Sequence, residues 1–214
     1  MFDTVIFDFD GTLVDTSRGI FNGVNYALRA MGVAEDSDPD HLRRMVGPPL
    51  REGFAANYGV DGEVATAKYR EYYSVKGLFE CEAFDGIDDL LCALKDSGKR
   101  IAVATIKPQE YTARIVEALG WSEKIDVIVG APMDGSCDDK GALIGRVIER
   151  LGGVDASCTV MVGDRVSDIE GGRQNGLKTV FCGFGFAADK VGESALADYT
   201  VDTVEQLAEV LLGE

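Results

Sequence analysis

The chain has 214 residues, 46% of them hydrophobic, and its 21 Lys and Arg stand against 37 Asp and Glu, which gives a formal net charge of −16. A chain of this length can bury enough surface to fold without disulfides or a structural metal, and its acidity argues against nucleic acid and anionic membranes as partners. The chain has one histidine, which excludes a two-histidine zinc site. We expect a cytoplasmic protein with reduced thiols, because the five cysteines form no C-x-x-C pair, the N-terminus has no basic leader and no apolar stretch reaches membrane length.

The first predicted strand, residues 4–9, is an apolar run that ends in acidic residues. Its sequence, TVIFDF, leads into two acids two residues apart, Asp8 and Asp10, and Gly11 and Thr12 follow at once. A single Asp after a strand is often only a turn former. Two like charges at the end of a buried strand are costly unless they have partners, so this pair indicates a binding or catalytic site.

Residues 16–83 contain no convincing strand but several helical patterns, at 17–31, 39–46, 49–58 and 61–75. Asp38 and Asp61 stand at the start of two of these helices, where N-cap residues are expected. We interpret the stretch as a helical-bundle insertion, residues 16–83, in a core formed by residues 1–15 and 84–214.

A basic stretch lies inside this insertion. The segment HLRRMVGPPLR (41–51) contains three Arg, one His and no acid, and it includes a Gly-Pro-Pro turn at 47–49. Such a segment fits a patch that faces an anionic substrate, and a solvated helix face is an equally simple alternative. On the first reading, Arg43, Gly47 and Arg51 are candidate substrate-binding residues.

From residue 84 onward, apolar runs alternate with helical patterns. The runs have strand length and lie at 100–105, 125–130, 159–164, 178–182 and 198–202, and helices are expected at 87–97, 108–119, 140–151 and 166–175. This alternation predicts an α/β fold whose core is a doubly wound parallel sheet, Rossmann-like, with helices on both faces.

Polar residues follow three of the predicted strands. Besides the first acidic pair, Thr105 ends the strand at 100–105 with Lys107 two residues on, and Asp164 ends the strand at 159–164 with Asp168 four residues on. In an open parallel sheet, ligands bind outside the carboxyl ends of the strands, so we expect these residues to converge. Crowded acids stay ionised only around a cation, and oxygen ligands without histidine or thiolate select Mg²⁺ together with a substrate phosphate.

Simpler explanations exist for several of these residues when each is taken alone. Asp168 fits a helix cap, Thr105 fits an ordinary strand residue, and Lys107 and Lys140 fit solvated surface lysines. The prediction of a functional site therefore depends on the fold bringing these acids, the threonine and the lysines close together.

Four motifs resemble those of the haloacid dehalogenase superfamily of phosphohydrolases. They are DFDGTLVD (8–15), the strand end at Thr105, Lys140 at the start of a later helix, and GDRVSD (163–168). The helical insertion resembles the cap of the phosphoglycolate phosphatase-like branch. VGPPLREGF, ATIKP and VMVGDRVSDIEGG are most similar to its phosphoglycolate phosphatase-like and bacterial 5'-nucleotidase-like members.

The resemblance implies a role for each acid. Asp8 would be the nucleophile that forms an aspartyl-phosphate, and Asp10 the general acid and then the general base. Asp8, the backbone carbonyl of Asp10, and Asp164 would hold Mg²⁺, with Asp168 supporting the metal directly or through its ligands.

The resemblance also implies a phosphate-binding set. Thr105 and the amides near Gly11 would hold the phosphate oxygens, and Lys140 would offset the charge of nucleophile and phosphate, with Lys107 as its rival. Ile106 and Gly141 depart from the family pattern, since a small polar residue and a proline are usual there.

The expected activity is Mg²⁺-dependent hydrolysis of a small-molecule phosphate ester, such as phosphoglycolate or a nucleoside monophosphate. A sugar phosphomutase would use the same core residues. A haloacid dehalogenase needs no acid at Asp10, and a non-enzymatic phosphate-binding protein would be expected to lose Asp8 or Asp10. The oligomeric state stays open, and a monomer is compatible with the sequence.

Overall fold

The structure is a computed structural model that describes residues 1–47, 49–133 and 139–213. The chain divides into two compact units, one formed by Met1–Val14 with Ala83–Glu214 and the other by Asp15–Glu82. Two short strands, β2 (Val14–Asp15) and β3 (Glu82–Ala83), pair where the chain passes from one unit to the other.

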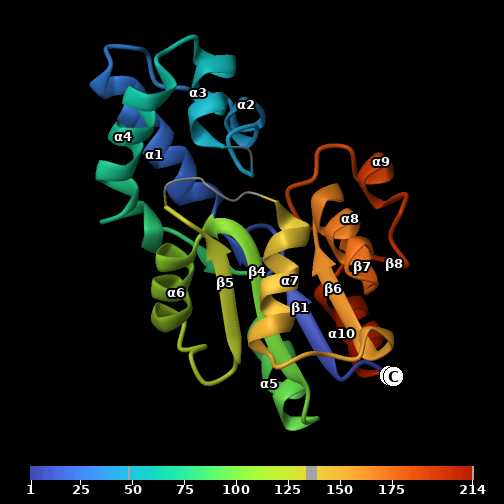
Figure 1. Ribbon diagram of the computed structural model, residues 1–214. Helices are drawn as coiled ribbons and strands as arrows, with labels where there is room; N and C mark the ends of the chain where they lie inside the picture. The colour runs from blue at the N-terminus through green and yellow to red at the C-terminus, as the bar shows by residue number, and fades with distance from the viewer. Residues whose placement is uncertain (48, 134–138, 214) are drawn as a thin grey trace. The chain divides into compact units, whose positions relative to one another are not determined.

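The first unit contains a six-stranded sheet in the order β5-β4-β1-β6-β7-β8 (Figure 1). Every neighbouring pair is parallel, which confirms the predicted fold class. The strands are β1 (Thr4–Phe7), β4 (Arg100–Pro108), β5 (Val127–Ala131), β6 (Thr159–Gly163), β7 (Lys178–Cys182) and β8 (Tyr199–Val201).

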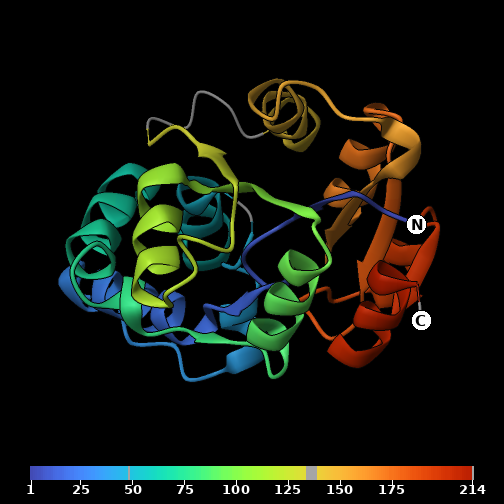
Figure 2. The ribbon, with the colours of Figure 1, turned by 90° about the horizontal axis from the view of Figure 1, so that it is seen from below.

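Helices cover both faces of this sheet (Figure 2). They are α5 (Ile87–Asp96), α6 (Gln109–Ala118), α7 (Lys140–Arg150), α8 (Val166–Gln174), α9 (Lys190–Ser194) and α10 (Val204–Leu212), with a 3₁₀ turn at Ala156–Cys158. Helices α7 and α8 pack on each other over one face, and α5 and α10 contact each other over the opposite face. The apolar side of α7, led by Leu143 and Val147, is buried against Ile6 of β1 and Ala102 of β4.

Strand β4 is longer than the sequence predicts. The apolar run suggests an end at Thr105, but the strand continues to Pro108, and its register with β5 shifts between these two residues. Bulges of this kind locally re-aim side chains and are common beside active sites.

The second unit is helical. It contains α1 (Ser17–Ala30), α2 (Pro39–Arg43), α3 (Leu50–Tyr58) and α4 (Gly62–Tyr73), followed by a 3₁₀ turn at Gly77–Phe79. Asp38 and Asp61 are N-caps as expected, because their carboxylates accept from the amides of Asp40 at 3.0 Å and Glu63 at 3.0 Å. Helix α2 ends earlier than predicted, and Met45 and Val46 lie in the turn that follows it.

In the described ranges, no helix combines the length and apolarity needed to cross a membrane. Cys81, Cys92, Cys158 and Cys182 are free thiols, and Cys137 lies outside the described residues.

Candidate active site

Three buried acids meet at the carboxyl edge of the sheet. Asp8 follows β1, Asp164 follows the adjacent strand β6, and Asp168 lies in the first turn of α8. One carboxylate oxygen from each lies within 4.8 Å of the other two. The amide of Asp8 donates to Val162 O at 2.8 Å, which extends the β1–β6 pairing to the point where the acids begin.

Asp168 is both a helix-terminal residue and a member of the acid cluster. Its Oδ2 accepts from the Arg165 amide at 3.0 Å, which fixes the start of α8, while its Oδ1 lies 2.8 Å from Lys140 Nζ. A side chain at Gly163 would collide with the Asp168 carboxylate. The same side chain therefore takes part both in the capping box at the start of α8 and in the acid cluster.

Lys140 is the cation of the cluster. It opens α7 behind the N-cap Asp139, and its Nζ lies 2.6 Å from Asp8 Oδ1 and donates to Ala104 O at 3.0 Å. Burial alone would lower the pKa of Lys140, but the carboxylates of Asp168 and Asp8 raise it above its usual value. The neighbouring carboxylates therefore keep the Lys140 ammonium in its charged form.

Lys107 takes a different position from Lys140. Its Nζ lies 3.0 Å from Asp10 Oδ1, and its amide donates to Thr105 Oγ1 at 3.1 Å. Lys107 and Thr105 are buried, and the Asp10 side chain is 18% exposed. The Asp10 carboxylate does not belong to the three-acid group, which is compatible with the expectation that only its carbonyl would face a metal.

The loop after β1 approaches the acids closely. Gly11 has φ 83°, and its amide donates to Val14 O at 3.0 Å. A Cβ at Gly11 would collide with the Asp164 carboxylate and the ring of Phe186. Only glycine suits both the backbone conformation and this spacing.

Sequence reasoning missed the segment after β7. The amide of Phe186 donates to Asp164 Oδ2 at 2.6 Å, and a side chain at Gly185 would collide with Asp164. A hydrogen bond from a backbone amide cannot be inferred from the type of residue that donates it. The available signal was the glycine pattern GFGF (183–186) directly after a predicted strand, a position where close backbone approach is expected.

The cluster carries excess negative charge. Asp8, Asp164 and Asp168 face one ammonium, that of Lys140, which leaves two negative charges when all four groups are ionised. Burial raises the pKa of Asp8 to about 6, although Lys140 opposes this. Burial, together with Asp168 and Asp8, raises the pKa of Asp164 well above its usual value. In addition, Asp164 Oδ1 is buried without a hydrogen-bond partner among the described residues.

Two arginines of the basic stretch in the second unit are each paired with an acid. Arg43 Nη1 lies 2.8 Å from Asp40 Oδ1, and Arg51 Nη1 lies 2.9 Å from Glu63 Oε1. Gly47 has φ 103°, and Pro48 of the predicted Gly-Pro-Pro turn lies outside the described residues. A substrate role for Arg43, Gly47 and Arg51 stays a prediction.

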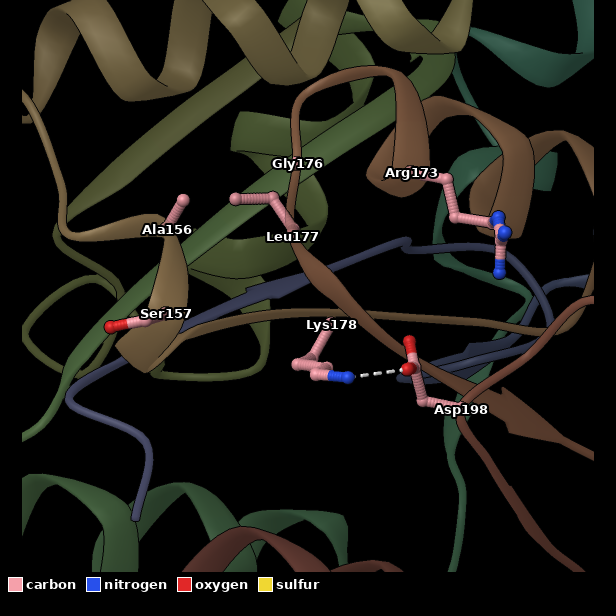
Figure 3. A pocket seen from close by; sticks show the side chains of 7 residues that line it. All are labelled: Ala156, Ser157, Arg173, Gly176, Leu177, Lys178 and Asp198. Atoms are coloured by element: carbon pink, nitrogen blue, oxygen red, sulfur yellow. Dashed lines mark hydrogen bonds and ion pairs between the residues drawn. The ribbon is translucent and has the colours of Figure 1, made fainter.

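A shallow hollow of about 290 Å³ lies elsewhere (Figure 3). Its lining includes Ser157, before β6, and Lys178, the first residue of β7, so it lies at the amino ends of the strands, away from the acids. Lys178 is already paired with Asp198 at 2.7 Å, and Arg173 donates to Leu196 O at 2.9 Å. The hollow offers no comparable cluster of groups.

Comparison with known proteins gives consistent family matches. Residues 5–182 match the haloacid dehalogenase-like hydrolase family. A 5'-nucleotidase of Pseudomonas aeruginosa is 35% identical over 191 residues, covering 88% of this chain and 86% of its own. The protein named tyrosine-protein kinase PtkA of Mycobacterium tuberculosis is 37% identical over 210 residues, covering 97% and 72%. The crystal structure of a predicted phosphatase from Clostridium acetobutylicum superposes with a TM-score of 0.89 at 35% identity, with all of both chains covered.

Proposed function

The chain belongs to the haloacid dehalogenase-like hydrolase family and is a phosphoric monoester hydrolase, and we propose that it removes phosphate from a small-molecule ester through Mg²⁺ and an aspartyl-phosphate on Asp8. The observation that carries this proposal is the buried cluster of three acids and one lysine, with its two uncompensated negative charges.

The residues present fit a divalent metal. The ligand atoms would be carboxylate oxygens, which Mg²⁺ prefers. Asp164 Oδ1 is buried without a hydrogen-bond partner among the described residues and could bind the ion. Asp8, Asp164 and the carbonyl of Asp10 would hold the ion. Because Asp168 contacts Lys140 and the Arg165 amide, it would support the site by fixing these groups.

The first half-reaction places the phosphate ester against Asp8. An Asp8 oxygen attacks phosphorus, the bond from phosphorus to the leaving oxygen breaks, and protonated Asp10 gives its proton to that oxygen. The Thr105 hydroxyl and the amides near Gly11 hold the phosphate oxygens, while Lys140 offsets the negative charge of nucleophile and phosphate. When bound, Mg²⁺ neutralises charge on the phosphate and the acids.

The second half-reaction returns the enzyme to its starting state. The Asp10 carboxylate takes a proton from water, whose oxygen attacks phosphorus as the bond to Asp8 breaks. Phosphate leaves, Asp8 is again a carboxylate, and Asp10 is again protonated. Phosphoryl transfer needs alignment and charge neutralisation more than covalent chemistry, which is what this set of groups would supply.

The proposed substrates are nucleoside monophosphates and phosphoglycolate. The name of the Pseudomonas relative supports the first of these. The test measures phosphate release from both, from pyrophosphate, sugar phosphates and an aryl phosphate, with Mg²⁺ and with excess chelator. A haloacid is included to detect halide release, and ATP with a tyrosine peptide to detect the transfer named for the mycobacterial relative. Phosphate release that is unaffected by the chelator would overturn the metal requirement.

Replacing Asp10 by Asn is expected to separate substrates by their leaving groups. The variant keeps the nucleophile but lacks the proton donor, and an aryl leaving group needs less acid help than an alkyl one. We expect kcat/KM to fall by about 10²-fold or more on an alkyl phosphate and by much less on an aryl phosphate. Equal losses on both would show that the Asp10 side chain is not the acid.

Replacing Arg51 by Ala tests whether this arginine of the second unit contributes to substrate binding and specificity. Its ion pair with Glu63 is exposed, and such pairs contribute little to stability, so the fold should survive. We expect kcat/KM for the preferred substrate to fall by about tenfold, and that for a small aryl phosphate to change little. Arg44→Ala on the neighbouring turn is the matched control, and equal losses on both substrates would remove Arg51 from the substrate site.

A further inference from the structure

We propose that Lys107 is a positioning residue for Asp10, rather than a second phosphate-binding lysine. The proposal rests on the proposed function, because it takes Asp10 as the group that exchanges a proton with the leaving oxygen and with water. The two lysines of the site then divide the work: Lys140 holds Asp8, and Lys107 holds Asp10.

The contact between Lys107 and Asp10 is short and enclosed. Lys107 Nζ lies 3.0 Å from Asp10 Oδ1, and only 5% of the Lys107 side chain is exposed. A lysine is rarely buried unless it is paired, and this ion pair joins Lys107 to the Asp10 carboxylate directly. The ammonium therefore restrains the Asp10 carboxylate through one identified oxygen.

The backbone of β4 is shaped so that Lys107 reaches this position. The register with β5 passes from Thr105 opposite Gly130 to Pro108 opposite Ala131, so two residues of β4 lie in the irregular segment. The Thr105 hydroxyl accepts from the Lys107 amide at 3.1 Å and closes that segment. A side chain at Gly130 would collide with the Lys107 carbonyl and with the backbone of Gln109, so β5 is built to accommodate it.

A restraint on Asp10 has a kinetic consequence that a phosphate contact does not have. Loss of the restraint lets the carboxylate leave the position from which it protonates the leaving oxygen. Leaving groups that need a proton then suffer most, because general acid help contributes in proportion to that need. Loss of a phosphate contact would instead weaken every phosphate ester alike, along with inorganic phosphate.

The experiment compares Lys107→Met with wild type on a series of aryl and alkyl phosphates. Lys95→Met is the matched control, because Lys95 also holds an aspartate, Asp126, at 2.7 Å in the same unit. The readouts are the slope of log kcat/KM against leaving-group pKa and the inhibition constant of inorganic phosphate. Lys107→Gln is measured in parallel as a polar replacement in case the Met variant does not fold.

A steeper slope with an unchanged phosphate inhibition constant is expected, with about tenfold or greater loss on alkyl phosphates, while Lys107→Arg restores part of it. In an Asp10→Asn background, Lys107→Met should steepen the slope no further, since the pair acts as one unit. A uniform loss with weaker phosphate inhibition, or a full additional effect in that background, overturns the proposal. If the Asp8→Asn variant releases phosphate as fast as wild type, the proposed function itself fails. This outcome is seen before Lys107 is tested.

Discussion

Replacing Asp8 by Asn is expected to abolish phosphate release while the protein stays folded. Asn is nearly isosteric with Asp, but its amide is a poor nucleophile, and loss of a nucleophile typically costs more than about 10³-fold in kcat. Lys140 Nζ, 2.6 Å from Asp8 Oδ1, would keep a carbonyl oxygen to bind. Because Asp8 is one of three crowded acids, its neutralisation should not lower the melting temperature of the metal-free protein.

The measurement is phosphate release by purified variants, with circular dichroism and thermal unfolding as checks on folding. Asp3→Asn is the matched control, since Asp3 is exposed just before β1 and its backbone amide still donates to Cys158 O. Activity of Asp8→Asn within about tenfold of wild type would be incompatible with the nucleophile assignment.

Replacing Asp164 by Asn should remove activity and at the same time stabilise the metal-free protein at neutral pH. The folded-state pKa of Asp164 is well above its usual value, through burial and the neighbouring acids. An acid with a raised pKa contributes stability that is present below its unfolded-state pKa and is lost as pH rises through the folded-state pKa. In metal-free wild type, the burial of Asp164 beside the other acids therefore opposes folding once the pH exceeds its unfolded-state pKa.

The expected result is a smaller fall in melting temperature between pH 5 and pH 7.5 for metal-free Asp164→Asn than for metal-free wild type. The difference should correspond to about 1–3 kcal/mol at neutral pH. Added Mg²⁺ should raise the melting temperature of wild type and have little effect on the variant. A variant that is less stable than wild type at pH 7.5 without metal, or equally stabilised by Mg²⁺, would contradict this reading of the cluster.

The parallel sheet and the meeting of the acids follow from local sequence patterns. Buried strands of a doubly wound sheet read as continuous apolar runs, and the topology alone then brings Asp8 and Asp164 to one edge. The prediction for β4 stopped at Thr105 because Ile106-Lys107-Pro108 does not read as a strand. The bulge that extends it depends on the glycine at position 130 of the neighbouring strand, which no local window contains.

The different partners of Lys140 and Lys107 also became visible only in the structure. Both are single lysines near a strand end or a helix start, and only their distances to Asp8 and Asp10 separate them. The acid-free stretch at 41–51 looked more strongly basic in the sequence than its surroundings in the structure make it. The partners of its arginines lie just outside it, Asp40 immediately before it and Glu63 on α4, so a composition count within the window could not reveal them.

The central claim is that phosphate is transferred to Asp8, and trapping the intermediate tests it most directly. Asp10→Asn should still be phosphorylated by an aryl phosphate but lacks the base for hydrolysis, so the aspartyl-phosphate accumulates. Borohydride reduces an acyl phosphate to an alcohol, which would convert residue 8 to homoserine, and peptide mass spectrometry locates the change. Homoserine at position 8, dependent on substrate and absent from the Asp8→Asn/Asp10→Asn double variant, is the predicted result; turnover with homoserine at another acid, or with none at position 8, would contradict the account.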